Sequence, residues 1–148
     1  MIQGFGDMSL SLAFAAVGSA LGTGVAGMAA VGAWKKAFAQ NKTAPFTLLA
    51  FVGAPLTQTI YAWILRDQII GANLPATTPT YVFQAVLGLS AGIAMGASAY
   101  MQGKAAARAC DALAETGKGF GQYITVLGII ETVALFVMVF CMMALPSA

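Results

Sequence analysis

The chain contains no histidine, only two cysteines and few charged residues of either sign. Among its 148 residues, lysine and arginine together number 7, aspartate and glutamate number 5, and charged residues make up 8%. Without histidine, the usual zinc sites and histidine-based acid–base catalysis are excluded. The net charge of +2 is small and no basic patch with interleaved aromatic residues is present, so nucleic acid is not an expected partner.

Hydrophobic residues make up most of what is present. They account for 59% of the chain, and the mean hydropathy is +0.83, as is typical of an integral membrane protein. A helix needs about 20 apolar residues to cross a hydrocarbon core of ~30 Å. Four such spans use most of the length, so we predict a single membrane domain over residues 1–148 and no enzymatic activity.

Four apolar stretches separated by polar connections predict an all-α membrane fold of two helical hairpins. We place hairpin one at residues 9–70 and hairpin two at residues 81–145. Hairpin two begins with a long helix that we expect to continue past the membrane to Glu115. A turn at Gly117 and Gly119 then leads into the last span.

The two hairpins have related sequences, which indicates a duplicated unit. The first span of each carries small residues four positions apart, Gly18, Gly22 and Ala26 in one and Gly88, Gly92 and Gly96 in the other. Such stripes allow another helix to approach closely. In the second spans, Gln58–Thr59 corresponds to Glu131–Thr132, so only the second copy carries an acid.

Basic residues gather in two of the three connections. The first and third connections and the helix ends beside them hold Lys35, Lys36, Lys42, Lys104, Arg108 and Lys118, whereas the second holds Arg66. Under the positive-inside rule, loops 39–45 and 114–119 are cytoplasmic and both termini are non-cytoplasmic. We therefore expect a multi-pass protein of the cell membrane.

One carboxylate interrupts the most apolar stretch. Between Phe120 and Leu145, the only charged side chain is Glu131, close to the middle of that span. A charge at the centre of the bilayer costs roughly 2.5 to 3.5 kcal/mol on insertion scales, so an acid there is a functional-site candidate. We therefore expect Glu131 to have a functional role.

Polar residues of two other spans are expected at the depth of Glu131. Thr57, Gln58 and Tyr61 share one face of the second span, and Gln58 lies at its midpoint. Gln102 and Glu131 are equidistant along the chain from the turn that joins their helices. We therefore predict that Gln58, Gln102 and Glu131 meet, although Thr57 and the glutamines also fit a packing role.

Gathered together, these groups form an all-oxygen site. Hard cations prefer carboxylate, amide and hydroxyl oxygens, and a single negative charge suits a monovalent ion. A protonated carboxyl needs few partners, whereas Na⁺ needs several oxygens, which Thr57, Gln58 and Gln102 supply. Pro55 frees the carbonyl of Phe51 and not that of Ala54, so proline alone does not make Ala54 a ligand. Na⁺ and H⁺ both stay open.

Two glycine-rich hairpins, one carboxylate in the fourth span and the Pro-x-Thr-Gln-x-x-Tyr run from Pro55 to Tyr61 resemble the ring-forming proteolipid of V-type ATPases, often called the K or c subunit. The resemblance covers essentially the whole chain and is strongest with the bacterial Na⁺-transporting branch. It implies a homo-oligomeric ring of identical subunits in lipid. It also implies partners, which are a stator subunit with a basic residue and central-stalk subunits at the cytoplasmic loops.

The resemblance further implies a role for each site residue. Na⁺ is expected to bind the Ala54 backbone carbonyl and the side chains of Thr57, Gln58, Gln102 and Glu131, with Tyr61 hydrogen-bonded to the carboxylate. Ala54 departs from the leucine usual in that branch. No organic cofactor is expected, and H⁺ is the alternative ion. Lys104 lies close to Gln102, and we expect it to snorkel or to face the ring interior.

Other functions fit less well. A small multidrug exchanger should carry an acid early in its first span and aromatic residues around a cavity, but Asp7 precedes that span and the inner stripes are glycine. A structural spacer or pore-lining oligomer would leave Glu131 dispensable. The sequence therefore favours an ion-carrying rotor subunit.

Overall fold

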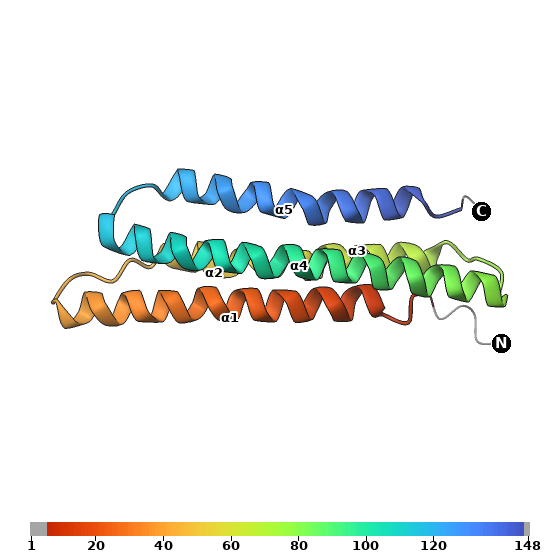
Figure 1. Ribbon diagram of the computed structural model, residues 1–148, viewed down its shortest axis with the longest axis horizontal. Coiled ribbons are helices and arrows are strands. Elements are labelled where there is room, and N and C mark those ends of the chain that lie inside the picture. Colours follow the sequence, from red (N-terminus) through yellow and green to blue (C-terminus); the bar gives the residue numbers. More distant parts are fainter. Residues whose placement is uncertain (1–5, 147–148) are drawn as a thin grey trace.

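The computed structural model describes residues 6–146, which form five α-helices and one short 3₁₀ helix with no strand among them. In chain order these elements are α1 (Leu10–Ala39), α2 (Leu48–Gly53), η1 (Ala54–Leu56), α3 (Thr57–Gly71), α4 (Thr78–Thr116) and α5 (Phe120–Met143) (Figure 1).

Four helical runs are long and apolar enough to cross a membrane, namely Leu10–Ala39, Leu48–Gly71, Thr78–Thr116 and Phe120–Met143. The second of these combines α2, η1 and α3. This confirms the all-α fold with four spans. Hairpin two begins at Thr78 and not near Tyr81, because Thr77 is extended and Pro79 fits the first turn of a helix, where no backbone N–H is needed.

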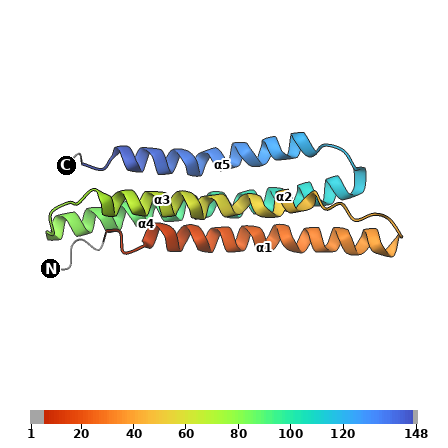
Figure 2. The ribbon, with the colours of Figure 1, turned by 180° about the vertical axis from the view of Figure 1, so that it is seen from behind.

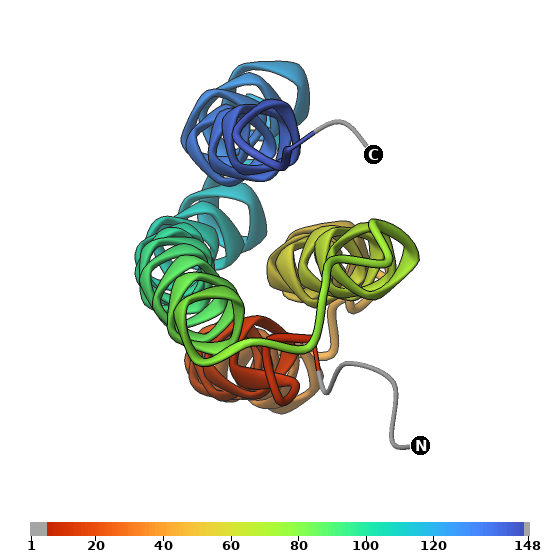
Figure 3. The same ribbon diagram turned by 90° about the vertical axis from the view of Figure 1, so that its right-hand side faces the viewer.

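The helices lie side by side with their connections at alternate ends. Figure 1 shows α1 beside α4 and α5 on the far side of α4, and Figure 2 shows α2 and α3 in front of α4 from behind. Seen along the bundle, α1, α4 and α5 form an arc that α3 faces (Figure 3). The first and third connections share one end, and α1 begins and α5 ends at the other.

Small residues explain why α1 and α4 pack closely. A Cβ atom added to Gly18 would overlap the backbone of Gly96, and one added to Gly103 would overlap the backbone of Gly22. The predicted stripes therefore face each other across the two hairpins, with Gly103 as an additional member. Helices of one hairpin need not pair with each other when their smallest residues match those of the other hairpin.

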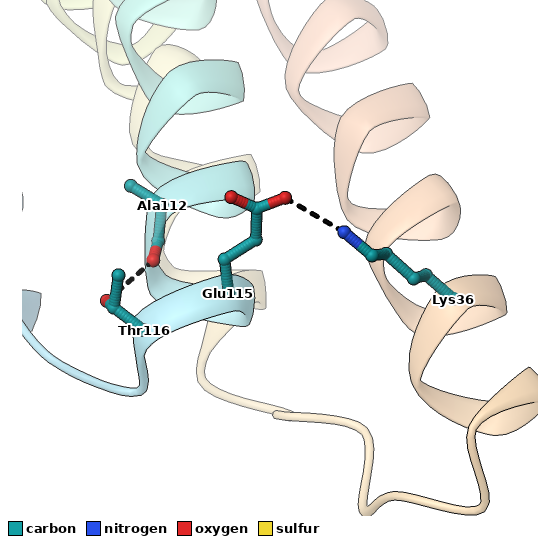
Figure 4. A network of polar contacts seen from close by, with 4 residues as sticks. All are labelled: Lys36, Ala112, Glu115 and Thr116. Carbon is teal, nitrogen blue, oxygen red and sulfur yellow. Dashed lines mark hydrogen bonds and ion pairs between the residues drawn. The ribbon is translucent and has the colours of Figure 1, made fainter.

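Polar contacts lie near both ends of the α1–α4 pair, one within the start of α1 and one between the two helices. At one end, the fully buried carboxylate of Asp7 accepts hydrogen bonds from the backbone N–H groups of Ser9 (3.0 Å) and Ser11 (2.9 Å), which begin α1. At the other, Lys36 Nζ lies 2.9 Å from Glu115 Oε1, as Figure 4 shows. Both side chains of that ion pair are more than half exposed, so it contributes little stability.

The turn between α4 and α5 depends on two glycines. Gly117 and Gly119 have φ angles of 65° and 90°, in the left-handed region that glycine adopts without steric cost. The turn residues predicted from sequence therefore close the second hairpin and set α5 antiparallel to α4.

Candidate functional site

The second span changes helix type just before its polar residues. Pro55 has no backbone N–H to donate to the preceding turn, and residues Ala54–Leu56 form a 3₁₀ turn. The carbonyl of Ala54 accepts a hydrogen bond from the backbone N–H of Thr57 and a second, of 3.0 Å, from the Thr57 hydroxyl. Thr57 is thus bonded back to its own turn, and α3 starts there.

Gln58 and Gln102 join α3 to α4 inside the bundle. Both side chains are fully buried, and Gln58 Nε2 donates to Gln102 Oε1 at 2.8 Å. A buried amide without a partner costs free energy, so the two glutamines stabilise each other's burial. Gln58 Oε1 in turn lies 3.3 Å from the Thr57 hydroxyl.

Glu131 of α5 is held from two sides. The Tyr61 hydroxyl of α3 donates to Glu131 Oε1 at 2.6 Å, and Gln102 Nε2 of α4 donates to Oε2 at 3.3 Å. The bond from Tyr61 is short, as is usual when the acceptor is charged, and the bond from Gln102 is long. Residues 57, 58, 102, 131 and 61 thus form one hydrogen-bonded series across three helices.

Polar groups also attach the α5 backbone to α4 beside the site. Gln102 Nε2 donates to the carbonyl of Leu127 at 2.9 Å, and Ser98 Oγ, one turn earlier, donates to the carbonyl of Ile130 at 2.9 Å. Within α5, only Leu127 and Ala134 are buried among the residues described. Together with the apolar contacts of Leu127 and Ala134, these two bonds position Glu131.

Several side-chain and backbone oxygens lie near Glu131, but not all of them face its carboxylate. The side-chain oxygen of Gln58, the hydroxyl of Thr57 and the carbonyl of Ala54 follow one another along a series of hydrogen bonds that begins at Gln102. The nitrogen of Gln102, and not its oxygen, faces Glu131. A half-turn of that amide would present its oxygen to a cation beside Glu131 Oε2, while Tyr61 remained on Oε1. The Gln58 amide would then have to turn as well, because its Nε2 now donates to the Gln102 oxygen.

The six residues singled out from the sequence meet in one region of the structure. Gln102 and Tyr61 contact Glu131 directly, whereas Gln58 reaches it through Gln102. Thr57 is bonded to Gln58, and the Ala54 carbonyl is bonded to Thr57. Their roles as ligands stay a prediction. No group of three or more acids or cysteines that could hold a metal occurs in residues 6–146.

Sequence reasoning missed two contributions to this region. Ser98 was not singled out, because serine is an ordinary small residue in a membrane helix. The carbonyl of Leu127 was also missed, because a backbone oxygen has no signal in the sequence. Ser98 does lie one turn before Gln102 on the same face of α4, and that spacing is the signal that could have found it.

Residues 85–144 match the family of the ATP synthase C subunit. The match covers most of α4 and all of α5, which is less than half of the chain, and includes Gln102 and Glu131. Members of this family are non-catalytic proteolipids that form homo-oligomeric rings. No curated protein matches the chain. The family match confirms the prediction of a non-catalytic membrane protein, and it supports an ion-translocating rotor-ring subunit.

Proposed function

We propose that the chain is the ion-carrying subunit of the rotor ring of a V-type ATPase in the cell membrane, and that it carries Na⁺ on Glu131. The observation that supports this is the position of Glu131 within its span, held by Tyr61 and connected through Gln102 to Gln58. Two amides, a hydroxyl and a carboxylate of one charge suit a monovalent hard cation.

The mechanism depends on the cost of a charge in hydrocarbon. With Na⁺ bound, the carboxylate is neutralised and the subunit can pass through lipid as the ring turns. Near a stator subunit with a basic residue, the ion leaves and the carboxylate is compensated by that cation. ATP hydrolysis by attached catalytic subunits would turn the ring through central-stalk subunits at the loops 39–45 and 114–119.

The two carboxylate oxygens of Glu131 have different roles in this mechanism. Tyr61 occupies Oε1 through its bond of 2.6 Å and fixes the orientation of the carboxylate. Oε2 has the longer bond of 3.3 Å from Gln102 and is the oxygen available to the ion. Na⁺ would exchange that bond for the oxygens of Gln102 and Gln58, with the Thr57 hydroxyl and Ala54 carbonyl completing the set.

ATP-driven uptake of ²²Na⁺ into vesicles that contain the assembled ATPase tests the proposal. The unmodified enzyme should accumulate ²²Na⁺, and Glu131→Gln should abolish uptake. Asp67→Asn, which removes an exposed carboxylate near the end of α3 and away from loops 39–45 and 114–119, is the matched control and should leave uptake unchanged. Equal uptake by the Glu131→Gln enzyme would show that this residue does not carry the ion.

A second measurement distinguishes Na⁺ from H⁺. Carbodiimides modify a protonated carboxyl, so bound Na⁺ should slow the labelling of Glu131 in a concentration-dependent manner. If Na⁺ has no effect on labelling and ATP hydrolysis acidifies the vesicles, the ring carries protons.

A further inference from the structure

A buried hydroxyl of α1 has no hydrogen-bond partner. The Ser19 side chain is 2% exposed, and its Oγ atom bonds no group within residues 6–146. Elsewhere in the long helices, the hydroxyls of Thr23, Ser90 and Thr125 donate to the carbonyl four residues earlier, as is usual for serine and threonine in membrane helices. Ser19 does not, although a buried polar group that makes no hydrogen bond is costly. Its oxygen can therefore accept a hydrogen bond from a neighbouring helix.

Two contacts show how α1 and the second span face each other. Near the start of α1, Ser11 Oγ donates to the carbonyl of Ala62 at 3.5 Å. Further along, a Cβ atom added to Gly22 would lie 3.0 Å from the Cβ atom of Pro55. Residue numbers thus rise along α1 while they fall along the second span, because the two run antiparallel (Figure 2). Buried residues between these contacts on one helix therefore face buried residues between them on the other.

Ser19 and Gln58 both lie between these two contacts. Ser19 follows Ser11 by two turns and precedes Gly22 by three residues, and all three are buried. Gln58 follows Pro55 by three residues, and both are buried. Residues at these spacings share one face of a helix, so Ser19 and Gln58 point into the same space between α1 and α3. The hydroxyl without a partner is thus at the level of the glutamine pair.

The proposed ion-bound arrangement needs an additional acceptor at this level. Gln58 Nε2 donates to Gln102 Oε1 at 2.8 Å, and Gln58 Oε1 accepts from the Thr57 hydroxyl at 3.3 Å. When Gln102 turns its oxygen toward the cation, its nitrogen faces Gln58 Nε2, and two donors cannot bond each other. Gln58 must then turn as well, which replaces its acceptor beside Thr57 with two N–H donors. The Thr57 hydroxyl can accept one of them, so the other needs a new partner.

We propose that Ser19 is a positioning residue for the ion site, and that its Oγ atom accepts a hydrogen bond from Gln58 Nε2 once that amide has turned. This bond holds the oxygens of Gln58 and Gln102 toward a cation at Glu131. The inference rests on the proposed function, because Ser19 contributes to the ion-bound arrangement alone. It gives α1 a part in ion binding, although α1 supplies none of the six residues singled out from the sequence.

The first test is the Na⁺ concentration that halves the rate of carbodiimide labelling of Glu131 in the purified oligomer of the full chain. Ser19→Ala should raise this concentration about fivefold, the size expected for one neutral hydrogen bond, and should leave the labelling rate without Na⁺ within twofold. Ser11→Ala is the matched control, because it removes a buried hydroxyl of the same helix that contacts α3 two turns from Ser19. Its half-protecting concentration should stay within twofold of that of the unmodified chain.

A second measurement separates positioning from packing. In a sodium-free choline buffer, Ser19→Ala should keep or raise the thermal unfolding temperature of the oligomer, because the hydroxyl that it removes is buried without a partner. A residue that acts through packing would instead lower the unfolding temperature when shortened. The expected result is therefore weaker protection by Na⁺ without any loss of stability in its absence.

Three results would overturn the proposal. One is a half-protecting Na⁺ concentration in Ser19→Ala that stays within twofold of the unmodified value, or shifts no more than in Ser11→Ala. Another is a lower unfolding temperature of Ser19→Ala in choline, or loss of its oligomer, which would show a packing role. The third is an unmodified oligomer that Na⁺ does not protect, which would refute the proposed ion as well. When Na⁺ protects the unmodified oligomer, the first two results refute the role of Ser19 alone.

Discussion

Replacing Gln102 with leucine is the most informative change at the candidate site. Its amide accepts a bond from Gln58 (2.8 Å), and donates to the carbonyl of Leu127 (2.9 Å) and to Glu131 (3.3 Å). Leucine has a similar volume and removes all three. The buried groups of Gln58 and Leu127 would lose a partner, and Glu131 would lose its contact with α4.

The magnitude follows from the oxygen that leucine cannot supply. In the proposed ion-bound state the Gln102 amide gives its oxygen to Na⁺, and one contact to a charged group contributes about 1.5 to 3 kcal/mol. At about 1.4 kcal/mol per tenfold, Gln102→Leu should weaken Na⁺ binding by about tenfold to a hundredfold. The loss of the three hydrogen bonds should in addition lower the stability of the folded chain.

The assay is the Na⁺ concentration that halves the rate of carbodiimide labelling of Glu131 in the purified oligomer. The matched control is Gln84→Leu, since Gln84 is a buried glutamine of the same helix that donates to the carbonyl of Ile69, far from Glu131. Its half-protecting concentration should stay within twofold of that of the unmodified chain. The reasoning fails if Gln102→Leu also stays within twofold, or if the two variants shift equally.

Three further changes test the surrounding structure. Ser98→Ala should raise the half-protecting Na⁺ concentration about fivefold, because α5 loses a neutral hydrogen bond of about 1 kcal/mol, and Ser98→Thr should restore it. Gly18→Ala should lower the thermal unfolding temperature of the oligomer, because the added Cβ would push α1 away from α4. Gly32→Ala is the control on the same helix and should not lower it, because there is open space around Gly32. In a double-mutant cycle, Lys36→Gln and Glu115→Gln should show a coupling below about 1 kcal/mol, decreasing with added salt, because both side chains are exposed; a larger, salt-independent coupling would contradict this.

Much of the fold could be predicted from the sequence because the length and hydrophobicity of each apolar run can be read directly from it. Each apolar run is long enough to cross the membrane, and a polar turn ends it, so four spans follow without knowledge of their neighbours. The length of the helix after Thr78 was also predictable, since nothing breaks it before Gly117. Where the prediction differed, as at the start of α4, the cause was a local proline at a helix N-terminus.

The candidate site could be predicted in part. Glu131 stands out because a charge in an apolar run is costly, and Gln58 and Gln102 follow from depth alone. Depth does not determine contact, and the structure shows that Gln58 reaches Glu131 through Gln102. Nor does depth determine which amide atom faces the carboxylate, because that depends on the other partners of the amide.

The sequence by itself determined the number of spans, the small-residue stripes and the one acid in the last span. Only the tertiary structure decided that the stripes of α1 and α4 face each other, that Ser98 bonds the α5 backbone, and that Lys104 turns back over Tyr100. The physical reason is that apolar character adds up residue by residue along one helix. Contacts between helices depend on their relative rotation and axial offset, which all the packed side chains set together.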